Sequence, residues 1–252
     1  DWLIENLSEP IESKGLSVAL VPASGGAGAS LLSCGLAFHA RQLFDEFALV
    51  DLDASSASLD ITFGIENQPG MRWHDFAELS GSINGNDIYR SLPTRDSIGL
   101  LTHGSLSSAE SVIPSELVLE KLKEVCDLVV IDFPKASDKE FSLETLTGCD
   151  LVLVVTTATV RGCANAKLTI AALAGYARNI ELVVRNIPGS NLNPVQIAEL
   201  LNTPLACVIN TDVRIVEQIE QGFGISGINL GNFTRNLNAL AHRILNLKEF
   251  RS

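Results

Sequence analysis

A glycine-rich segment follows the first apolar run of the sequence and has the composition of an anion-binding turn. The run Ser17–Pro22 leads into Ala23–Ser30, which reads ASGGAGAS, and Leu31–Ala40 has a helical pattern. Where a strand is followed by a glycine-rich turn and a helix, the backbone N–H groups of the turn and the helix N-terminus point toward one place. The ligand expected there is a phosphate group. The alternative is that the glycines only let a strand and a helix pack closely. The residues whose backbone would surround the phosphate, called the phosphate cradle below, are Gly25, Gly26, Ala27, Gly28, Ala29 and Ser30.

The positive charge that usually accompanies such a loop is missing. A full phosphate loop reads GxxxxGK[ST], in which the lysine reaches the terminal phosphates and the hydroxyl binds magnesium. This sequence keeps the hydroxyl at Ser30 and has Ala29 in the lysine position. Losing one charge-assisted contact costs on the order of 1.5–3 kcal/mol, or roughly a tenfold to hundredfold loss of affinity. Because no Lys or Arg occurs from Gly15 through Ala40, we expect backbone dipoles alone to attract the anion.

Acidic residues stand where two other apolar runs end. Asp51 and Asp53 follow the second run in the sequence VDLD, and Asp132 ends the fourth run in VIDFP. If these strands neighbour the first, the three carboxylates and the glycine loop meet at one edge of the sheet. Carboxylates beside a phosphate cradle suit a bound magnesium ion and an oriented water molecule. The alternative is that each Asp caps the turn or helix that follows it.

Short apolar runs alternate with helix-length stretches along the chain. Because the runs are apolar on consecutive residues, both faces of each strand must be covered, as in a parallel sheet between two helix layers. We therefore expect a doubly wound α/β fold with a mainly parallel sheet of about seven to eight strands. The expected strands are Leu16–Val21, Phe47–Leu52, Ile98–Thr102, Leu128–Asp132, Leu151–Thr156, Ile180–Val184 and Leu205–Ile209, and a helix is expected over Pro114–Val125.

Residues 15–252 are interpreted as one domain, because no shift in composition marks a boundary within them. Ala54–Ser97 is rich in turn residues and is interpreted as a long insertion after the second strand, with short helical pieces such as Arg72–Leu79. Residues 1–14 are interpreted as a linker from a region farther upstream. Within the insertion, Met71–Asp75 combines Arg and Trp, which either anchor an interface or pack as a helix face.

The charge balance excludes one class of partner. The chain has 18 basic and 30 acidic residues and a net charge of −12, which repels a phosphate backbone, so we expect no nucleic-acid binding. No apolar run approaches the roughly 20 residues that cross a bilayer. The five cysteines have no CxxC spacing and indicate buried thiols in a reducing compartment. With no basic and apolar leader, the protein is expected in the cytoplasm.

The ordered set of motifs resembles the MinD/ParA superfamily of deviant Walker ATPases. The set consists of SGGAGAS, VDLD, VVIDFP, LVLVVTT and a late Asn210–Asp212. Further segments are similar to the CpaE-like or TadZ-like branch, and in particular to the actinobacterial septum site-determining Ssd proteins. These segments are LDITFGIE, PGMRWHDF, SLPTRDSIGLL and VVRNIPG, and the resemblance extends over residues 15–225.

The resemblance implies ATP and Mg²⁺ in the glycine loop and homodimers that meet face to face over the nucleotide. It also implies partner proteins from the cell-division machinery or a pilus or secretion apparatus, with recruitment to a septum or pole. The family's two lysines would fall at Ser24 and Ala29, and both are absent. We therefore expect a pseudo-ATPase that binds ATP weakly or not at all and acts through protein contacts. The alternatives are an active ATPase with charge from Lys135 or Arg161, and a scaffold that binds no nucleotide.

The resemblance also assigns roles to single residues. Ser30 takes the magnesium-hydroxyl position, Asp51 lies near the metal, and Asp132 holds the metal through water. In an active protein, Asp53 would orient the attacking water. The residues that would line the adenine are Arg185, Asn186 and Asp212.

The last part of the chain has apolar residues at helical spacing and an excess of basic residues. Two interpretations are open. The helix docks on the sheet, or it lies on an anionic membrane surface, as the terminal helix does in MinD relatives. The apolar residues are Phe233, Leu237, Leu240, Ile244 and Leu247, and the basic ones are Arg235, Arg243, Lys248 and Arg251.

Overall fold

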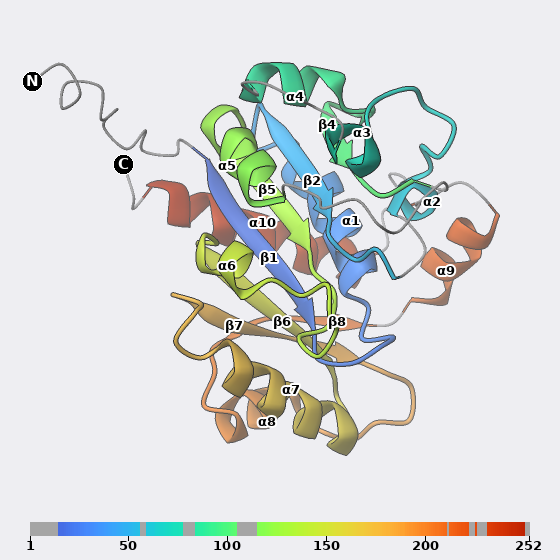
Figure 1. The fold of residues 1–252 in the computed structure, drawn as a ribbon. Helices are drawn as coiled ribbons and strands as arrows, with labels where there is room; N and C mark the ends of the chain where they lie inside the picture. The colour runs from blue at the N-terminus through green and yellow to red at the C-terminus, as the bar shows by residue number, and fades with distance from the viewer. Residues whose placement is uncertain are drawn as a thin grey trace, which may run out of the picture.

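The computed structural model describes residues 15–55, 59–77, 84–104, 115–210, 212–221, 225 and 231–249, so the expected linker over 1–14 lies outside the described residues. Within the described part, eight strands form one sheet in the order β3-β4-β2-β5-β1-β6-β7-β8 (Figure 1). Neighbouring strands are parallel except for β3 and β4. The strands are β1 (Leu16–Pro22), β2 (Phe47–Asp51), β3 (Thr94–Arg95), β4 (Ile98–Leu101), β5 (Leu128–Asp132), β6 (Leu151–Thr157), β7 (Ile180–Asn186) and β8 (Leu205–Asn210).

Helices cover both faces of this sheet, which confirms the doubly wound α/β fold. In Figure 1, α5 and α6 lie in front of the central strands and α10 lies behind them. One layer contains α1 (Ala29–Ala40), α2 (Leu59–Phe63), α9 (Val213–Glu220) and α10 (Asn232–Glu249). The other contains α3 (Trp73–Ala77), α4 (Gly85–Ser91), α5 (Ser115–Val125), α6 (Leu143–Thr147), α7 (Val160–Leu173) and α8 (Pro194–Leu200).

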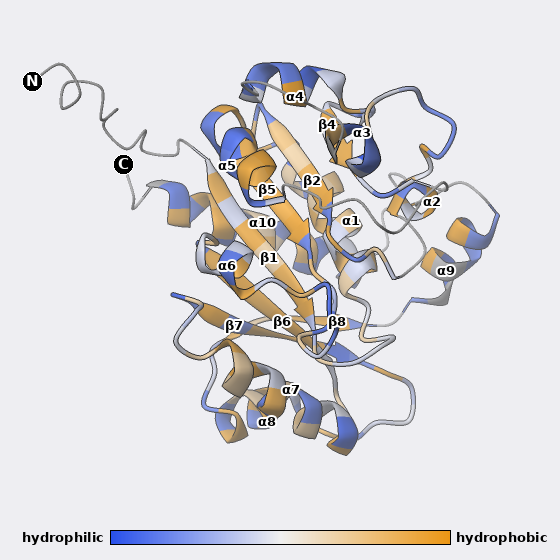
Figure 2. Cartoon of the chain, viewed as in Figure 1, coloured by the Kyte–Doolittle hydropathy of each residue, from blue (hydrophilic) through white to orange (hydrophobic). Residues whose placement is uncertain are grey.

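The strands are apolar on both sides because each side faces a helix layer. Along β1, Leu16, Val18 and Leu20 belong to one core, whereas Ala19 and Val21 belong to the other. Figure 2 shows the central strands as hydrophobic ribbons, with hydrophilic residues on the outer sides of the helices. The consecutive apolar residues of the sequence therefore predicted the two-layer cover correctly.

The strand order brings the predicted acidic residues toward the glycine loop. Strand β5 lies between β1 and β2, so that the Cα of Asp132 pairs with Leu20 on one side and Asp51 on the other. Strand β6 borders β1 on its far side, and β7 follows β6. Because these strands are parallel, their carboxyl ends share one edge of the sheet.

The insertion after β2 contains short elements, as expected. They include α2, α3, α4 and the two-residue strand β3, which pairs antiparallel with β4. The helical piece expected over Arg72–Leu79 appears as Trp73–Ala77, and residues 78–83 lie outside the described part. Trp73 is 1% exposed and donates a 2.6 Å hydrogen bond from Nε1 to the backbone oxygen of Asp51. Trp73 therefore packs inside the protein, as the packing interpretation of this segment predicted.

Helix α10 docks on the fold through its apolar side. Its buried residues contact α1 so closely that a Cβ at Gly35 would lie 2.8 Å from Leu237 Cδ1. Basic residues of α10 pair with acids of the body: Arg243 with Glu181 and Lys248 with Asp127. The residues of α10 in the core are Phe233, Leu237, Leu240, Ala241 and Ile244.

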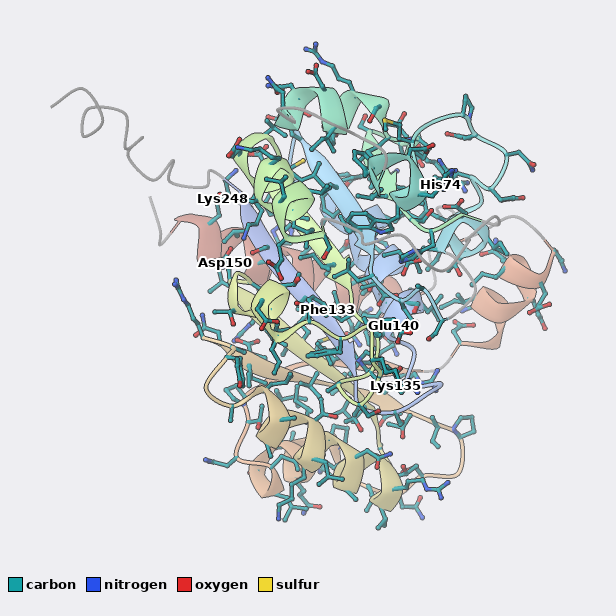
Figure 3. The ribbon with its side chains drawn as sticks, viewed as in Figure 1. His74, Phe133, Lys135, Glu140, Asp150 and Lys248 are labelled. Carbon is teal, nitrogen blue, oxygen red and sulfur yellow. The ribbon has the colours of Figure 1, made fainter. Side chains whose placement is uncertain are left out.

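The docked position of α10 removes the apolar face that the membrane interpretation needs, so the docking interpretation describes this helix. Figure 3 shows Lys248 of α10 at the end of the sheet opposite Lys135, which lies near the carboxyl ends of the strands. No helix in the described part of the chain is long and apolar enough to cross a membrane.

Candidate nucleotide-binding site

The glycine loop ends at an uncapped helix N-terminus. Gly28 occupies the N-cap position of α1 in the left-handed region, with φ 96°, and no side chain caps the helix. Gly26 also has a positive φ, of 73°. Only glycine adopts these backbone angles without strain. The unpaired N–H groups of the first turn of α1 therefore remain available to an anion.

Close packing does not account for the glycines. A Cβ added at Gly25 or Gly26 would have no heavy atom within 4 Å, and at Gly28 its nearest neighbours belong to the Arg185 side chain. At Gly25 the backbone has no positive φ either, so neither packing nor conformation requires glycine there. The empty space beside Gly25 and Gly26 favours the interpretation that the loop receives a ligand.

Asp132 is hydrogen-bonded to two serines in the first turns of α1, of which Ser33 is buried and Ser30 is half-buried. Asp132 is 1% exposed, and its Oδ1 accepts a 2.9 Å hydrogen bond from the Ser33 hydroxyl. The Ser30 hydroxyl also hydrogen-bonds this carboxylate. Burial raises the pKa of Asp132 to about 7, although the two serine hydrogen bonds lower it, and the charge of Asp53 adds to the increase. The structure thus brings together Ser30 and Asp132, two of the three residues, with Asp51, that the resemblance assigned to magnesium.

Asp51 instead organises the turn that follows β2. Its Oδ1 accepts a hydrogen bond from the N–H of Asp53 (3.0 Å) and its Oδ2 accepts one from Leu59 (3.1 Å). Burial and the nearby charge of Asp132 raise the pKa of Asp51 well above its usual value. Both carboxylate oxygens therefore hold the backbone in place, which is the capping role that the sequence left open as an alternative to a metal role.

Asp53 is partly exposed and closes the next turn. Its Oδ1 accepts hydrogen bonds from both the N–H (3.0 Å) and the hydroxyl (2.7 Å) of Ser55. Asp53 follows Asp51, whose Cα pairs with Asp132 at the ends of β2 and β5, so the two carboxylates lie at the same edge of the sheet. The charge of Asp53 accordingly raises the pKa of Asp132. Asp53 thus shares the sheet edge with the loop, as the sequence predicted.

A side-chain cation lies beside the glycine loop. This finding corrects the expectation that backbone dipoles alone attract an anion. Arg185, at the end of β7, donates a 2.7 Å hydrogen bond from Nη2 to the backbone oxygen of Gly26. A Cβ at Gly28 would lie 3.2 Å from Nη1 of the same guanidinium. The sequence count missed this charge because Arg185 lies 159 residues away from Gly26 along the chain.

The other residues assigned to adenine have different partners. Asn186 donates a 3.0 Å hydrogen bond from Nδ2 to Oδ1 of Asn210, across the β7–β8 pair. Asp212 caps α9 by accepting a hydrogen bond from the Arg214 N–H, and it forms a 2.6 Å ion pair with the Arg214 side chain. This pairing lowers the pKa of Asp212. Of the three residues, Arg185 is hydrogen-bonded to the glycine loop, at Gly26.

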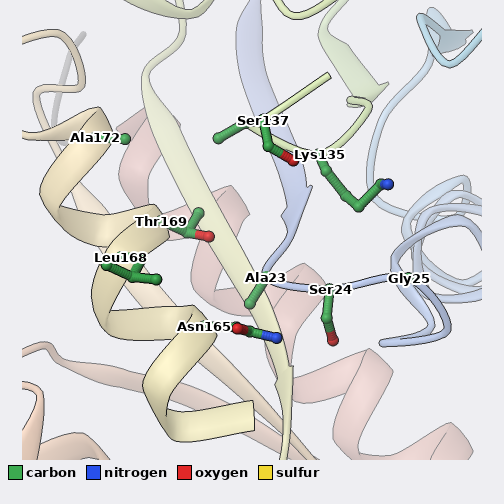
Figure 4. Close-up of a pocket in the computed structure, with 10 residues that line it drawn as sticks. Ala23, Ser24, Gly25, Lys135, Ser137, Asn165, Leu168, Thr169 and Ala172 are labelled. Carbon is green, nitrogen blue, oxygen red and sulfur yellow. The ribbon is translucent and has the colours of Figure 1, made fainter. Parts of the chain in front are cut away.

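A cavity of about 450 Å³ opens beside the start of the loop (Figure 4). It lies between Ala23–Gly25, the segment Lys135–Ser137 that follows β5, and α7. Lys135 lines the cavity and forms a 3.1 Å ion pair with Asp138. The other proposed source of charge, Arg161, is exposed on α7 and does not line the cavity. Lys135 is thus placed near Ser24, where the family's first lysine would stand.

A buried ion pair near the site was not predicted. Arg72 Nε lies 3.1 Å from Oδ2 of Asp60, and Thr102 donates a hydrogen bond to the other oxygen of that carboxylate. His103 follows Thr102, with a buried Nε2 that has no hydrogen-bond partner within the described residues. The sequence feature that could have indicated this pair is a charged residue inside an apolar segment, Asp60 in LDITF and Arg72 in MRW. This cluster fastens the insertion to the end of β4.

The residues present fit a phosphate group with magnesium. The loop offers an open, uncapped helix N-terminus, and Ser30 with Asp132 offers the hydroxyl and carboxylate oxygens that magnesium prefers. No group of three or more His, Cys, Asp or Glu residues in the described ranges is arranged to hold a metal ion. A magnesium ion here would therefore depend on the phosphate oxygens of its ligand for most of its coordination.

Two relatives have similar sequences. The chain is 30% identical to the uncharacterized protein Rv3660c of Mycobacterium tuberculosis over 226 residues, which are 87% of this chain and 63% of that protein. The chain thus spans less than two thirds of the length of this relative. It is 23% identical to the uncharacterized ATP-binding protein MJ0547 of Methanocaldococcus jannaschii, over 79% of this chain and 76% of that protein. No protein-family model matches the chain.

Several solved structures have the same architecture. The ParA family ATPase of Chlorobium tepidum superposes with a TM-score of 0.79 at 17% identity, over 91% of this chain and 98% of that one. The MinC:MinD cell division protein complex of Aquifex aeolicus superposes with a TM-score of 0.76 at 20% identity, over 92% of this chain and 96% of that one. The MinD of Pyrococcus horikoshii with Mg-ADP superposes with a TM-score of 0.74 at 17% identity, over 94% of this chain and 99% of that one. The chain therefore has the P-loop NTPase fold of the MinD and ParA ATPases.

Proposed function

We propose that this protein is a MinD/ParA-type spatial regulator that positions either the division septum or a pilus or secretion apparatus. The shared fold supports this, as do the segments similar to CpaE-like, TadZ-like and Ssd proteins. Cell division and septum-site determination, named for two of the structural neighbours, agree with it. In this proposal the protein works in the cytoplasm as a homodimer, is recruited to a septum or pole, and acts through contacts with the proteins of those assemblies.

The glycine loop, in this proposal, binds ATP with Mg²⁺ weakly and does not hydrolyse it. The observation that carries this is the combination of an open helix N-terminus with Ser24 and Ala29 at the two lysine positions. The backbone cradle that holds a phosphate is present, whereas the lysine charges that would stabilise transferring phosphoryl oxygens are absent. Binding without turnover suits a protein that changes partners according to its nucleotide state.

The magnesium part of the site also favours weak binding. Ser30 and Asp132 would hold the ion, and a cation requires the ionised carboxylate. Because the pKa of Asp132 is raised to about 7, a proton competes with the metal near neutral pH. Magnesium-dependent binding of ATP should therefore strengthen as the pH rises through this value.

Calorimetry with ATP and Mg²⁺ tests the proposal directly. The diagnostic variant is Gly25→Val, because a Cβ at this position meets no protein atom and the fold should be unaffected. We expect weak, saturable binding by the wild-type protein and its loss in Gly25→Val, whose side chain would fill the phosphate space. Val195→Ala is the control, since Val195 is 53% exposed on α8 and remote from the loop in sequence.

Two other outcomes would replace this proposal. If the wild-type protein binds no nucleotide, the protein is a scaffold that acts without one. If it hydrolyses ATP and Lys135→Ala stops the reaction, it is a working ATPase. The position of Lys135 in the cavity beside Ser24 is the observation that favours this second function.

A further inference from the structure

The side chain of Arg185 lies on the glycine loop although it comes from a distant strand. Its Nη2 donates to the Gly26 oxygen at 2.7 Å, and its Nη1 and Cδ would lie 3.2 and 3.5 Å from a Cβ at Gly28. The guanidinium therefore reaches both residues of the loop that have left-handed backbone angles. This is the segment whose neighbouring N–H groups face an anion in a phosphate loop.

The sheet fixes the place from which Arg185 extends. Its Cα pairs with Thr157 of β6 and with Ile209 of β8, and its backbone oxygen accepts a 2.9 Å hydrogen bond from Ala158. Strand β6 separates β7 from β1, so the long side chain spans one strand to reach the loop. Because the backbone is held on both sides, the guanidinium is positioned before any ligand arrives.

Most of the hydrogen-bonding capacity of this guanidinium is unused. An arginine side chain carries five N–H donors. Nη2 donates to Gly26, whereas Nε is buried and has no hydrogen-bond partner within the described residues. No carboxylate of the described ranges forms an ion pair with Arg185. Partial burial without a compensating charge also lowers the pKa of Arg185.

A buried donor without a partner and a cation without a counter-ion both cost free energy that an anionic ligand would recover. A purely structural role for Arg185, in which it only clamps the loop, explains the bond to Gly26 but not the unpaired Nε. Lys135 differs in this respect, because it is already paired with Asp138. Of these two cations near the loop, Arg185 is the one without a counter-ion among the described residues.

We propose that Arg185 supplies to the bound phosphate chain the positive charge that Ala29 does not provide. The inference rests on the proposed function, since it requires a nucleotide phosphate in the glycine loop. It replaces the expectation that Arg185 lines the adenine. The planar guanidinium forms paired, charge-assisted hydrogen bonds with phosphate oxygens, which a single ammonium group cannot do. In this proposal the cation that binds the phosphate extends from the end of β7 and does not belong to the glycine loop.

Calorimetric titration with two ligands tests this inference in the 252-residue chain. The ligands are ATP with Mg²⁺ and inorganic tripolyphosphate, which has no adenine. For Arg185→Ala we expect the affinity for both ligands to fall by roughly tenfold to hundredfold, the loss expected for one charge-assisted contact. If Arg185 contacted only the adenine, tripolyphosphate would bind to the variant and the wild-type protein equally, and the inference would be wrong.

Two further variants separate charge from structure. Arg185→Lys keeps the charge and should retain more affinity than Arg185→Ala. Arg185→Gln keeps a polar N–H donor but is uncharged, and it should bind as weakly as Arg185→Ala. If Arg185→Gln binds like the wild-type protein, the residue is only a clamp. Tighter binding by Arg185→Ala would show that the side chain blocks the loop, which also contradicts the inference.

The controls distinguish failure of this inference from failure of the proposed function. Arg178→Ala removes the same charge from an exposed position just before β7 and should bind both ligands normally. One outcome is that the wild-type protein binds ATP, that Gly25→Val abolishes this binding, and that Arg185→Ala leaves it unchanged. In that case the inference fails while the proposed function stands. If the wild-type protein binds neither ligand, the nucleotide part of the proposed function fails, and this inference fails with it.

Discussion

The hydroxyl of Ser33 donates a 2.9 Å hydrogen bond to Oδ1 of Asp132, a residue 99 positions later in the chain. Both residues are buried, and the bond joins the first turns of α1 to the end of β5. It therefore connects the helix that follows the glycine loop to the carboxylate of the candidate magnesium site.

Ser33→Ala should destabilise the fold and disturb the site together. Removing the hydroxyl deprives a buried carboxyl group of a hydrogen bond, which costs about 1–3 kcal/mol in the free energy of unfolding. Urea denaturation measures this loss, with Ser137→Ala in the exposed segment after β5 as the control. Equal stability of Ser33→Ala and the control would mean that the hydrogen bond contributes nothing.

Leu237→Ala tests whether α10 is part of the core. Leu237 is fully buried against α1, and truncating such a side chain costs about 2–5 kcal/mol. Leu200→Ala is the matched control, because Leu200 is 76% exposed on α8 and its truncation should change stability by about 0.5 kcal/mol or less. If Leu237→Ala keeps its stability but loses binding to anionic vesicles, α10 is a membrane helix and its docked position is wrong.

The buried pair of Arg72 and Asp60 should be essential to the insertion. Asp60→Ala leaves the Arg72 guanidinium buried without its carboxylate, and breaking a buried pair in this way costs about 3–5 kcal/mol. Arg214→Ala is the comparison, since that ion pair with Asp212 is exposed and such pairs contribute about 0–1 kcal/mol. Thermal unfolding of both variants measures the difference, and similar losses would contradict the assigned role of Asp60.

His103 should make the fold sensitive to acid. Burial lowers the pKa of His103, opposed by the charge of Asp53, so the folded protein resists protonation at this residue while the unfolded chain accepts a proton near pH 6.5. The stability that a neutral His103 contributes is therefore complete above about pH 6.5 and is lost as the pH falls below it, by at most about 1.4 kcal/mol per pH unit.

Denaturation of the wild-type protein and of His103→Gln across this pH range tests the expectation. The variant cannot be protonated at this position, so its stability should fall less steeply with acid than that of the wild-type protein. Parallel pH profiles for the two proteins would show that the buried histidine does not contribute to acid sensitivity.

The sequence predicted the framework because the relevant signals are local. Strand β5 was predicted with its observed bounds, Leu128–Asp132, since its residues are apolar without interruption and must be covered on both faces. Strand β3 was missed because Thr94–Arg95 is too short to have a period. The glycine loop was identified because a phosphate loop is a run of neighbouring residues in a fixed order.

The chemistry of single side chains was harder to predict, because it depends on contacts between distant segments. Arg185 reaches Gly26 only because β7 lies one strand away from β1, and no spacing in the sequence contains that information. Asp51 has the residue type and position of a metal ligand, yet its oxygens accept hydrogen bonds from Asp53 and Leu59. The sequence left two roles open for Asp51, a metal ligand and a cap of the following turn. The fold was needed to show which groups donate hydrogen bonds to its carboxylate oxygens.

Release of phosphate from ATP with Mg²⁺ tests the central claim most directly. We expect the purified wild-type protein and Asp53→Ala to release phosphate at the same background rate, because Ser24 leaves the site without the first of the two lysines, a charge that Arg185 does not replace. Release by the wild-type protein that is abolished in Asp53→Ala would contradict the account, and would show that this protein is a working ATPase.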